Sequence, residues 1–389
     1  MAENFIPFAI PAIEQEEKDA VINVLNSGWI TTGKVTLEFE TEFAKKLNVP
    51  YALAVNSATS GLILALEACK IGPGDKVLTT PYTFISTVTS CLHLGAEVVY
   101  ADIEKDSFNI DPEKIEEQLA KDSSIKAIIP VHIAGNICDM KKICEIAKKY
   151  EVYVIEDAAH AFPAKSVDGW AGTFGDMGVF SFYATKTITT AEGGMVVTSN
   201  PELAKRMTTM RLHGIDRNVW DRYTSKKASW QYDVVDAGFK FNLPDILSAI
   251  GIEQLKKADF FLEKRKRIVE KYNQEFSKYD FFILPPDSDG NAWHLYLLGL
   301  NLSKLNIDRD EFGNLLQESG IGISMHFIPH YKFSLWKGRT DLSEKYFPNA
   351  EEHFLRTISL PLWPGMTETM VQKVIDTVVK IGIENARIN

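Results

Sequence analysis

Between about residue 50 and residue 200, short runs rich in β-branched residues alternate with amphipathic segments. Seven of these runs are expected to be strands: 51–55, 76–80, 97–101, 126–131, 153–156, 178–182 and 194–198. Four intervening segments have helical periodicity: 59–69, 85–94, 112–119 and 140–150. This repetition predicts a largely parallel sheet with helices on both faces. Because ligands bind at the carboxyl ends of such strands, residues just after each strand are the first candidates for a site.

After residue 240 the pattern changes. The segment 244–278, rich in Leu, Ile, Glu and Lys, predicts a helix that leaves the first domain. Beyond two prolines we expect four further elements, namely a strand over 292–300, a helix over 309–319, a strand over 323–327 and a helix over 367–381. We therefore expect a large domain over residues 1–259 and a smaller α+β domain over residues 260–389. A helix over 13–27 fits either domain.

The composition is typical of a protein that folds throughout its length, since 45% of the 389 residues are hydrophobic and 24% are charged. A formal net charge of −10 disfavours nucleic acid and anionic membranes on average, although it permits a local basic pocket. The four cysteines form no CxxC pair, no apolar run is long enough for a membrane span, and the N-terminus does not resemble a secretory signal. We therefore expect a cytoplasmic location and no nucleic-acid or membrane partner.

Lys186 lies in a polar loop between two expected strands, in the segment Phe180-Ser-Phe-Tyr-Ala-Thr-Lys-Thr-Ile-Thr-Thr-Ala-Glu-Gly-Gly194. A lysine in such a loop is often only an exposed surface residue. Alternatively, its amine is a nucleophile that forms a Schiff base, with nearby hydroxyl groups and glycine amides available to a phosphate. The loop by itself is compatible with both interpretations.

Two other strand ends carry residues that suit the same chemistry. Asp157 follows an apolar run, where it either caps the next helix or pairs with the protonated pyridine nitrogen of a cofactor. Ser57, Ala58 and Thr59 form a strand-to-helix turn, which either caps the helix or also binds an anion. The glycines of the chain match neither a dinucleotide-binding fingerprint nor a P-loop.

In this order and spacing, the three segments resemble the fold-type I pyridoxal phosphate enzymes, specifically the DegT/DnrJ/EryC1/StrS family of nucleotide-sugar aminotransferases. The resemblance runs almost from end to end. The matching motifs include Gly28-Trp-Ile-Thr-Thr-Gly33, Asn56-Ser-Ala-Thr59, Pro81-Tyr-Thr-Phe84, Glu156-Asp-Ala-Ala159, Gly172-Thr-Phe-Gly175, Glu192-Gly-Gly194 and Ser359-Leu-Pro361. The resemblance implies an α/β fold, with a large domain whose mostly parallel sheet is covered by helices and a smaller C-terminal α+β domain.

The resemblance also implies a role for each residue of these segments. Lys186 would form the Schiff base with pyridoxal 5'-phosphate and act as general acid and base in the 1,3-proton shift. Asp157 would hold the pyridinium nitrogen, and Phe84 would stack on the ring. The phosphate would be held by Ser57, Ala58, Thr59 and Ser181.

The sequence departs from the family pattern at three places. Ala58 replaces a common glycine, which keeps the amide but makes a positive φ costly. His160 replaces a frequent glutamine, so it either is a core or surface histidine or hydrogen-bonds the phenolic oxygen of the cofactor. The segment Gly238-Phe-Lys-Phe-Asn-Leu243 resembles a variant in the branch that aminates the 4-keto pentose of UDP-4-amino-arabinose synthesis.

In the family this last segment reaches the cofactor phosphate or nucleotide of the neighbouring subunit. Lys240 and Asn242 are therefore expected to bind the cofactor in trans, in a homodimer with composite active sites, unless Lys240 is only an exposed loop lysine.

His326 and His330 flank a segment with a proline, which prevents the helix that an i, i+4 zinc-binding pair needs. We therefore expect no metal. The resemblance places this stretch at the sugar-binding cleft, where the two histidines would hydrogen-bond the sugar or phosphate, or simply fix the loop. The same cleft would include Trp29, Thr31 and Thr32.

The resulting hypothesis is a pyridoxal-phosphate-dependent aminotransferase that uses an amino acid, expected to be L-glutamate, to aminate a nucleotide-linked 4-keto or 3-keto sugar. UDP is expected over dTDP or GDP, and the product would serve a surface polysaccharide, lipopolysaccharide or glycan. One alternative is a sugar dehydratase-like enzyme, against which Lys186 argues because that branch has a histidine there. The other is an inactive regulatory or binding relative, which the complete set of motifs disfavours.

Overall fold

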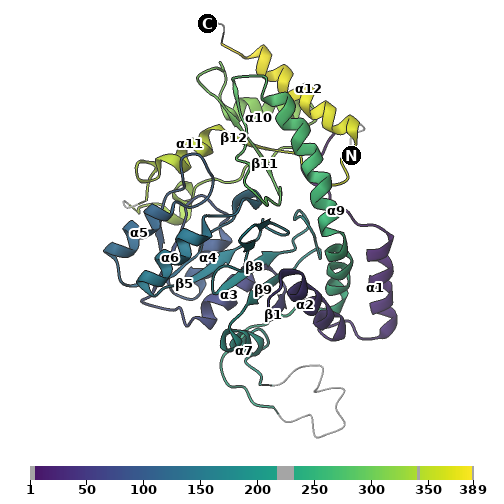
Figure 1. Ribbon diagram of the computed structural model, residues 1–389, viewed down its shortest axis with the longest axis vertical. Coiled ribbons are helices and arrows are strands. Elements are labelled where there is room, and N and C mark those ends of the chain that lie inside the picture. Colours follow the sequence, from purple (N-terminus) through teal and green to yellow (C-terminus); the bar gives the residue numbers. More distant parts are fainter. Residues whose placement is uncertain (1–4, 217–231, 340–341, 388–389) are drawn as a thin grey trace.

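The computed structural model describes residues 5–216, 232–339 and 342–387, and its centre is a seven-stranded sheet flanked by helices (Figure 1). The strand order is β1-β9-β8-β5-β4-β2-β3. The strands are β1 (Tyr51–Val55), β2 (Lys76–Thr79), β3 (Glu97–Tyr100), β4 (Ile125–Ile128), β5 (Tyr153–Asp157), β8 (Met177–Ser181) and β9 (Gly194–Thr198). Within this sheet β9 runs antiparallel to both of its neighbours, and the other pairs are parallel. The expected α/β sheet is therefore confirmed.

Helices cover both faces of this sheet because successive side chains of each strand alternate between two cores. On β9, Val196 packs in the core beneath α3, whereas Met195 and Val197 pack in the core beneath α2. The helices of this part are α2 (Lys34–Leu47), α3 (Ala58–Ala68), α4 (Ser86–His93), α5 (Pro112–Lys121), α6 (Met140–Tyr150) and α7 (Pro201–Met210). A two-stranded ribbon of β6 (Lys165–Ser166) and β7 (Gly169–Trp170) lies beside the sheet.

A smaller antiparallel sheet has the order β10-β11-β12. Its elements are β10 (Phe282–Ile283), β11 (Tyr296–Leu300), β12 (Thr357–Leu360), α10 (Arg309–Glu318), α11 (Pro348–Arg356) and α12 (Glu368–Glu384). The expected strand over 323–327 is wrong, because only Ser324 pairs with β12, at Ser359, before the chain turns toward His326. The expected strand over 292–300 begins late, because residues 292–295 pair with the loop around Ala134.

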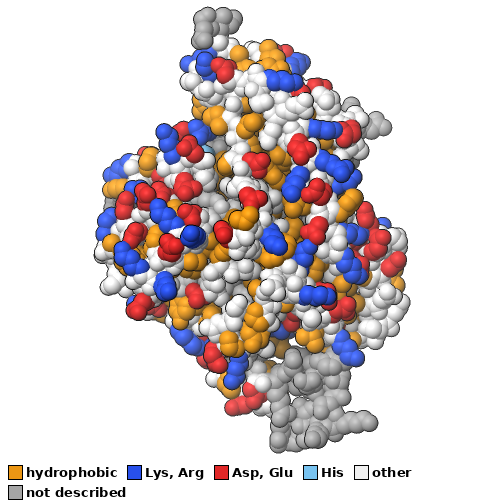
Figure 2. Space-filling view, viewed as in Figure 1, with side chains coloured by type: hydrophobic (Ala, Val, Ile, Leu, Met, Phe, Trp, Pro, Cys, Tyr) orange, Lys and Arg blue, Asp and Glu red, His pale blue; other side chains and the backbone are white. Residues whose placement is uncertain are grey.

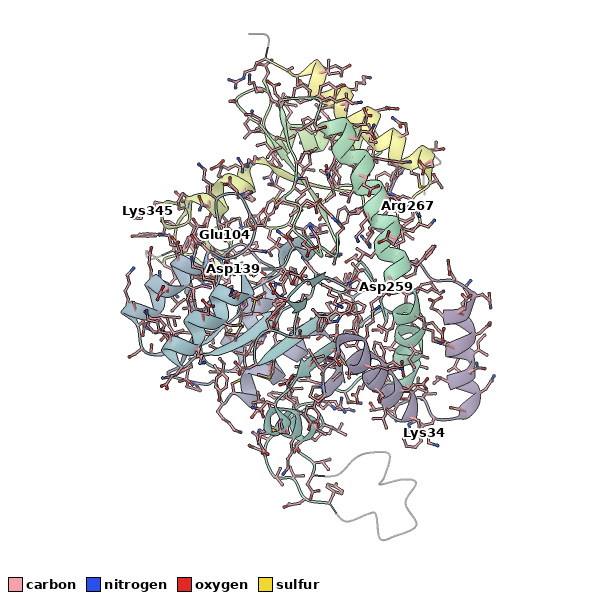
Figure 3. All side chains as sticks on the ribbon, viewed as in Figure 1. Lys34, Glu104, Asp139, Asp259, Arg267 and Lys345 are labelled. Carbon is pink, nitrogen blue, oxygen red and sulfur yellow. The ribbon has the colours of Figure 1, made fainter. Side chains whose placement is uncertain are left out.

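The helix α9 (Asp245–Phe276) connects the two sheets over 32 residues (Figure 1). Near its start Leu255 belongs to a core of the large sheet, and further along Tyr272 belongs to the core of the small sheet. Figure 3 labels Asp259 and Arg267 on the stretch between these two cores. The helix is continuous across residues 259 and 260, so the division into two domains at that point stays a prediction.

The N-terminal part of the chain contacts both cores. The helix α1 (Gln15–Ser27) packs along the first half of α9, where Gln254 Nε2 donates to Glu17 Oε1 at 2.8 Å. Before this helix, Ile6 pairs with Ile321 of the smaller part.

Charges of both signs are interspersed over the face shown in Figure 2. None of the helices within the described ranges is long and apolar enough to cross a bilayer.

Candidate active site

A cavity of about 360 Å³ opens at the carboxyl ends of β1, β2, β5 and β8. The strands β1, β5 and β8 point the same way, so the residues that follow them meet at one edge of the sheet. Nine of the residues singled out in the sequence line this cavity: Ser57, Ala58, Thr59, Phe84, Asp157, His160, Ser181, Lys186 and His326.

Lys186 lies in the loop that joins β8 to the neighbouring β9. The loop is closed at its base by hydrogen bonds from Phe182 N to Gly193 O at 2.9 Å and from Thr190 N to Phe182 O at 3.0 Å. Loss of water around the amine lowers the pKa of Lys186 to about 8, although the charge of Asp157 opposes this shift. At pH 7 about one tenth of such amines are neutral, which is far more than for an ordinary lysine. The loop therefore presents an amine that is ready to act as nucleophile and base.

Asp157 ends β5 with a buried carboxylate. Its Oδ2 accepts a hydrogen bond from Thr87 Oγ1 at 2.8 Å, and its Oδ1 accepts one from the amide of Ala159 at 3.2 Å. Burial raises the pKa of Asp157, while these hydrogen bonds and the charge of Lys186 oppose the rise. A turn follows Asp157 rather than a helix, so the carboxylate does not cap one. It is held at the cavity, where a cationic partner would stabilise it.

The adjacent Glu156 points to the other side of the strand and has a structural role. Its carboxylate accepts hydrogen bonds from the amides of Gly172, Phe174 and Gly175 at 2.6–2.7 Å. It also pairs with His132 Nε2 at 2.9 Å. The alternation of side chains along β5 thus separates two consecutive carboxylates into two different functions.

The N-terminus of α3 forms a second wall of the cavity. Ser57 Oγ accepts a hydrogen bond from Ser60 N at 3.1 Å, so its hydroxyl caps the helix. The amides of Ala58 and Thr59 lie in the first turn and have no intrahelical partner, which makes them available to an anion. Ala58 is helical and is not among the residues with positive φ, so alanine adds no backbone strain here.

Three histidines and three phenylalanines line the cavity, and His160, His326, Phe84 and Phe327 are among them. The Nδ1 of His160 accepts a hydrogen bond from Ala134 N at 3.3 Å, and its ring stacks on Phe327 at 5.6 Å. Burial lowers the pKa of His160 well below its usual range, so the ring is neutral with its proton on Nε2. His326 Nδ1 pairs with Ser359 Oγ at 2.8 Å, and burial lowers its pKa to about 3. Phe84 lies in the cavity wall with 58% of its surface exposed.

Five other expected site residues form a separate cluster beside the end of β1 and do not line the cavity. Asn242 Nδ2 donates to Thr32 Oγ1, Trp29 Nε1 donates to Thr32 O at 3.2 Å, and Lys240 Nζ donates to Asn242 Oδ1. Thr31 joins them through its carbonyl, which accepts a hydrogen bond from Asp245 N at 3.3 Å.

His330 also lies outside the cavity. Its ring is completely buried, stacks on Trp336 at 5.4 Å and pairs with the carbonyl of Thr83 at 3.0 Å. These contacts fix the loop, which is one of the two roles expected for this residue.

Several lining residues were not singled out in the sequence, and Phe8, Thr83, Tyr183, His294 and Phe327 are among them. A histidine inside the apolar run 292–300 was the available signal for His294. For Phe8 we find no sequence signal, because its place in the cavity depends on the pairing of residue 6 with residue 321.

The cavity offers a partner to each reactive group of pyridoxal phosphate. It holds a partly neutral amine for the aldehyde, a buried carboxylate for the ring nitrogen, free helix amides for the phosphate and an aromatic ring for stacking. The residues present therefore fit this cofactor. Within the described ranges, no three or more His, Cys, Asp or Glu side chains are grouped to hold a metal ion.

Comparisons with known proteins agree with this arrangement. A model of the DegT/DnrJ/EryC1/StrS aminotransferase family matches residues 11–379. The spore coat polysaccharide biosynthesis protein SpsC of Bacillus subtilis is 41% identical over 378 residues, which is 96% of either chain.

Two solved structures share the fold over nearly the whole chain. Helicobacter pylori PseC, an aminotransferase involved in the biosynthesis of pseudoaminic acid, matches with a TM-score of 0.90 and 31% identity over 98% of this chain and 100% of that one. The putative sugar aminotransferase Spr1654 from Streptococcus pneumoniae, in its PMP form, matches with a TM-score of 0.91 and 29% identity over 97% and 99%. The chain therefore belongs to the DegT/DnrJ/EryC1/StrS aminotransferase family, a family of sugar aminotransferases that use pyridoxal 5'-phosphate.

Proposed function

We propose that the enzyme transfers the amino group of L-glutamate to the keto carbon of a nucleotide-linked sugar. The observation that carries this proposal is the placement of Lys186 and Asp157 in one cavity with the free amides of α3. The dehydratase-like alternative is not favoured, because that branch has a histidine at the position of Lys186.

Each residue then has a defined task. When bound, pyridoxal phosphate supplies an electron sink for the carbon that loses its proton. Asp157 keeps the ring nitrogen protonated, and Thr87 holds the carboxylate in place. Lys186, as a neutral amine, removes the proton from one carbon and returns it to the other. The amides of Ala58 and Thr59, together with Ser57 and Ser181, would hold the phosphate, Phe84 would stack on the ring, and His160 would donate from Nε2 to the phenolic oxygen.

The relatives support an amino sugar as the product. SpsC is named for spore coat polysaccharide biosynthesis and PseC for pseudoaminic acid biosynthesis. We infer by analogy that this chain serves a surface polysaccharide, lipopolysaccharide or glycan. The segment 238–243, which contains Lys240 and Asn242, resembles the variant found in the branch that makes UDP-4-amino-arabinose. This resemblance favours UDP over dTDP or GDP as the nucleotide. All four cysteines are free, which supports the proposed cytoplasmic location.

A homodimer would give the second cluster a function. Lys240 is exposed, and its only hydrogen bond from Nζ within the described residues goes to Asn242. Its segment is attached to the cofactor side of the sheet, because Asn56 N donates to Phe241 O at 2.7 Å. The cluster of Trp29, Thr31, Thr32, Lys240 and Asn242 is therefore proposed to complete the site of the neighbouring subunit. His326 is proposed to contact the sugar from within its own chain.

A substrate panel tests the proposal. The holoenzyme is incubated with L-glutamate and each of the 4-keto and 3-keto sugars linked to UDP, dTDP or GDP, and amino-sugar formation is followed by mass spectrometry. We expect amination of a UDP-linked keto-sugar, with an equimolar yield of 2-oxoglutarate and no product from a Lys186→Ala control. The proposal is contradicted if no member of the panel is aminated by the wild-type enzyme.

A further inference from the structure

His294 lines the cavity, yet the roles proposed above leave it without a task. It precedes β11, and its ring lies 4.5 Å from that of His160, measured between centroids. The side chain is only 5% exposed. A buried histidine in this position requires a physical explanation, since buried polar groups are normally hydrogen-bonded.

The backbone of His294 is fixed without help from its side chain. Its amide donates to Ala134 O at 2.9 Å, and its carbonyl accepts a hydrogen bond from Arg265 Nη1 at 3.2 Å. The same guanidinium nitrogen also donates to the carbonyl of Leu362 at 2.6 Å. Because Arg265 lies on α9, these hydrogen bonds attach the residues before β11 to that helix. These backbone contacts would form equally with an apolar side chain, so they do not explain why the residue is a histidine.

Both ring nitrogens of His294 lack a partner within the described part of the chain. Nδ1 is buried without any hydrogen bond, and none is made by Nε2. The two neighbouring cavity histidines differ in this respect, because His160 and His326 each use Nδ1 in a hydrogen bond to the protein. Nδ1 of His294 is closed off by protein atoms, whereas Nε2 is not among the fully buried atoms, so Nε2 is the ring nitrogen that is left for a ligand.

The His294 ring is uncharged, which favours an uncharged ligand group. Burial is the main cause that lowers its pKa well below the usual range, and the neighbouring cations Lys186 and Arg265 add to the shift. A neutral ring supplies no counter-charge of its own to a carboxylate and offers it at most one hydrogen bond from the exposed nitrogen, which is less than a carboxylate needs to replace its hydration. A hydroxyl group both donates and accepts, so it matches a neutral imidazole in either tautomer.

We propose that His294 is a substrate-binding residue that hydrogen-bonds a hydroxyl group of the sugar and takes no part in recognition of the amino acid. This inference rests on the proposed function, because it requires that the second substrate is a sugar. It divides the cavity between the two substrates: His294 acts in the half-reaction with the sugar, whereas the half-reaction with L-glutamate proceeds without it.

The two half-reactions of the holoenzyme are measured separately by stopped-flow absorbance, one with L-glutamate and the other with the keto-sugar that the wild-type enzyme aminates. His294→Phe removes both nitrogens, and His294→Asn and His294→Gln return a polar group near Nδ1 and Nε2, respectively. His353→Phe removes a buried imidazole outside the cavity and serves as the matched control.

For His294→Phe we expect the apparent Kd of the sugar to rise about five- to tenfold, the loss typical of one hydrogen bond. The rate with L-glutamate should stay within about twofold of wild type, which also shows that the variant is folded and loaded. One of the two amide variants should recover part of the sugar affinity, and the control should resemble wild type. A deoxy analogue of the sugar that lacks the recognised hydroxyl should bind to wild type and to His294→Phe with equal affinity.

Two results overturn the inference alone: an unchanged sugar affinity in His294→Phe, or an equal loss in both half-reactions. A wild-type enzyme that aminates no keto-sugar overturns the proposed function and, with it, the substrate that His294 is proposed to bind.

Discussion

At Lys186, loss of water outweighs the attraction of the nearby Asp157 carboxylate, and the pKa of the amine falls to about 8. Because the neutral amine is the nucleophile, the attachment of pyridoxal phosphate to apoenzyme should accelerate with pH until the amine is fully neutral. We expect the rate, followed by absorbance, to rise nearly tenfold per pH unit below pH 8 and to level off above it.

The same profile in Asp157→Asn tests the coupling between the two residues. Removal of the carboxylate removes the interaction that raises the pKa of Lys186, so the profile should move to lower pH. A profile that stays in place or moves to higher pH would contradict the electrostatic account of the cavity.

Asp157→Asn should also separate cofactor binding from catalysis. The variant keeps Lys186 and the amides at the N-terminus of α3 that bind the phosphate, so much of the cofactor should stay bound. A neutral amide does not stabilise the protonated ring, and we expect kcat to fall by about a hundredfold or more. The matched control is Asp139→Asn, which keeps a cap on α6 and should leave kcat unchanged (Figure 3). Equal kcat values for the two variants would exclude the proposed role of Asp157.

At the scale of elements, the start of β9 supports the N-terminus of α3. A Cβ atom on Gly194 would lie 2.8 Å from both Ala58 N and Phe180 O, so only glycine permits this approach. Gly194→Ala should therefore displace the N-terminus of α3. We expect binding of pyridoxal phosphate to weaken about tenfold, as expected for overpacking by one methyl group. Titration of apoenzyme with the cofactor measures this effect.

Gly72→Ala is the control for that substitution. The added Cβ would meet only Leu94 O, at 3.9 Å, and we expect wild-type affinity. If Gly194→Ala binds the cofactor as tightly as Gly72→Ala does, the contact between β9 and α3 has no influence on the site.

Most elements of the large sheet could be predicted because each lies in a run with one clear period. The strand Tyr51–Val55 and the helix Met140–Tyr150 have the expected bounds. The spacing of Phe39, Phe43 and Leu47 would also have identified α2, for which we made no prediction. By contrast, β12 follows α11 directly, so no turn residue marks its start, and the segment 323–327 leaves the sheet after one paired residue.

The site was predictable to the extent that it lies at strand ends. Lys186, Asp157 and Ser57 follow strands whose direction the alternating pattern predicts, so their meeting at one edge follows from topology. His294 and Phe8 enter the cavity through packing of the smaller part and the N-terminal segment against the large sheet. That packing depends on contacts between residues far apart in the chain, which no local pattern contains.

At the scale of the whole molecule, the proposed dimer is tested by mixing subunits. Lys186→Ala lacks the nucleophile, and Lys240→Ala lacks the proposed trans contact, so each parent should be nearly inactive. If Lys240 acts in trans, the mixed dimer contains one complete site and should regain up to about half of wild-type activity. Differently tagged subunits isolate the mixed species and verify the exchange.

A dimer of wild type with the double variant Lys186→Ala/Lys240→Ala gives the reverse outcome. If Lys240 acts in trans, neither site of this dimer is complete and little activity is expected. If Lys240 acts within its own chain, the wild-type subunit has a complete site and about half of wild-type activity is expected. Little activity in the first mixture together with half activity in the second would refute the shared site.

Chemical trapping of the cofactor on this chain tests the assignment of Lys186 most directly. The holoenzyme is reduced with borohydride, digested and mapped by mass spectrometry. A single phosphopyridoxyl group is expected, on Lys186, and Lys186→Ala should give no labelled peptide and no transaminase activity. Label on another lysine, or full activity in Lys186→Ala, would contradict this assignment.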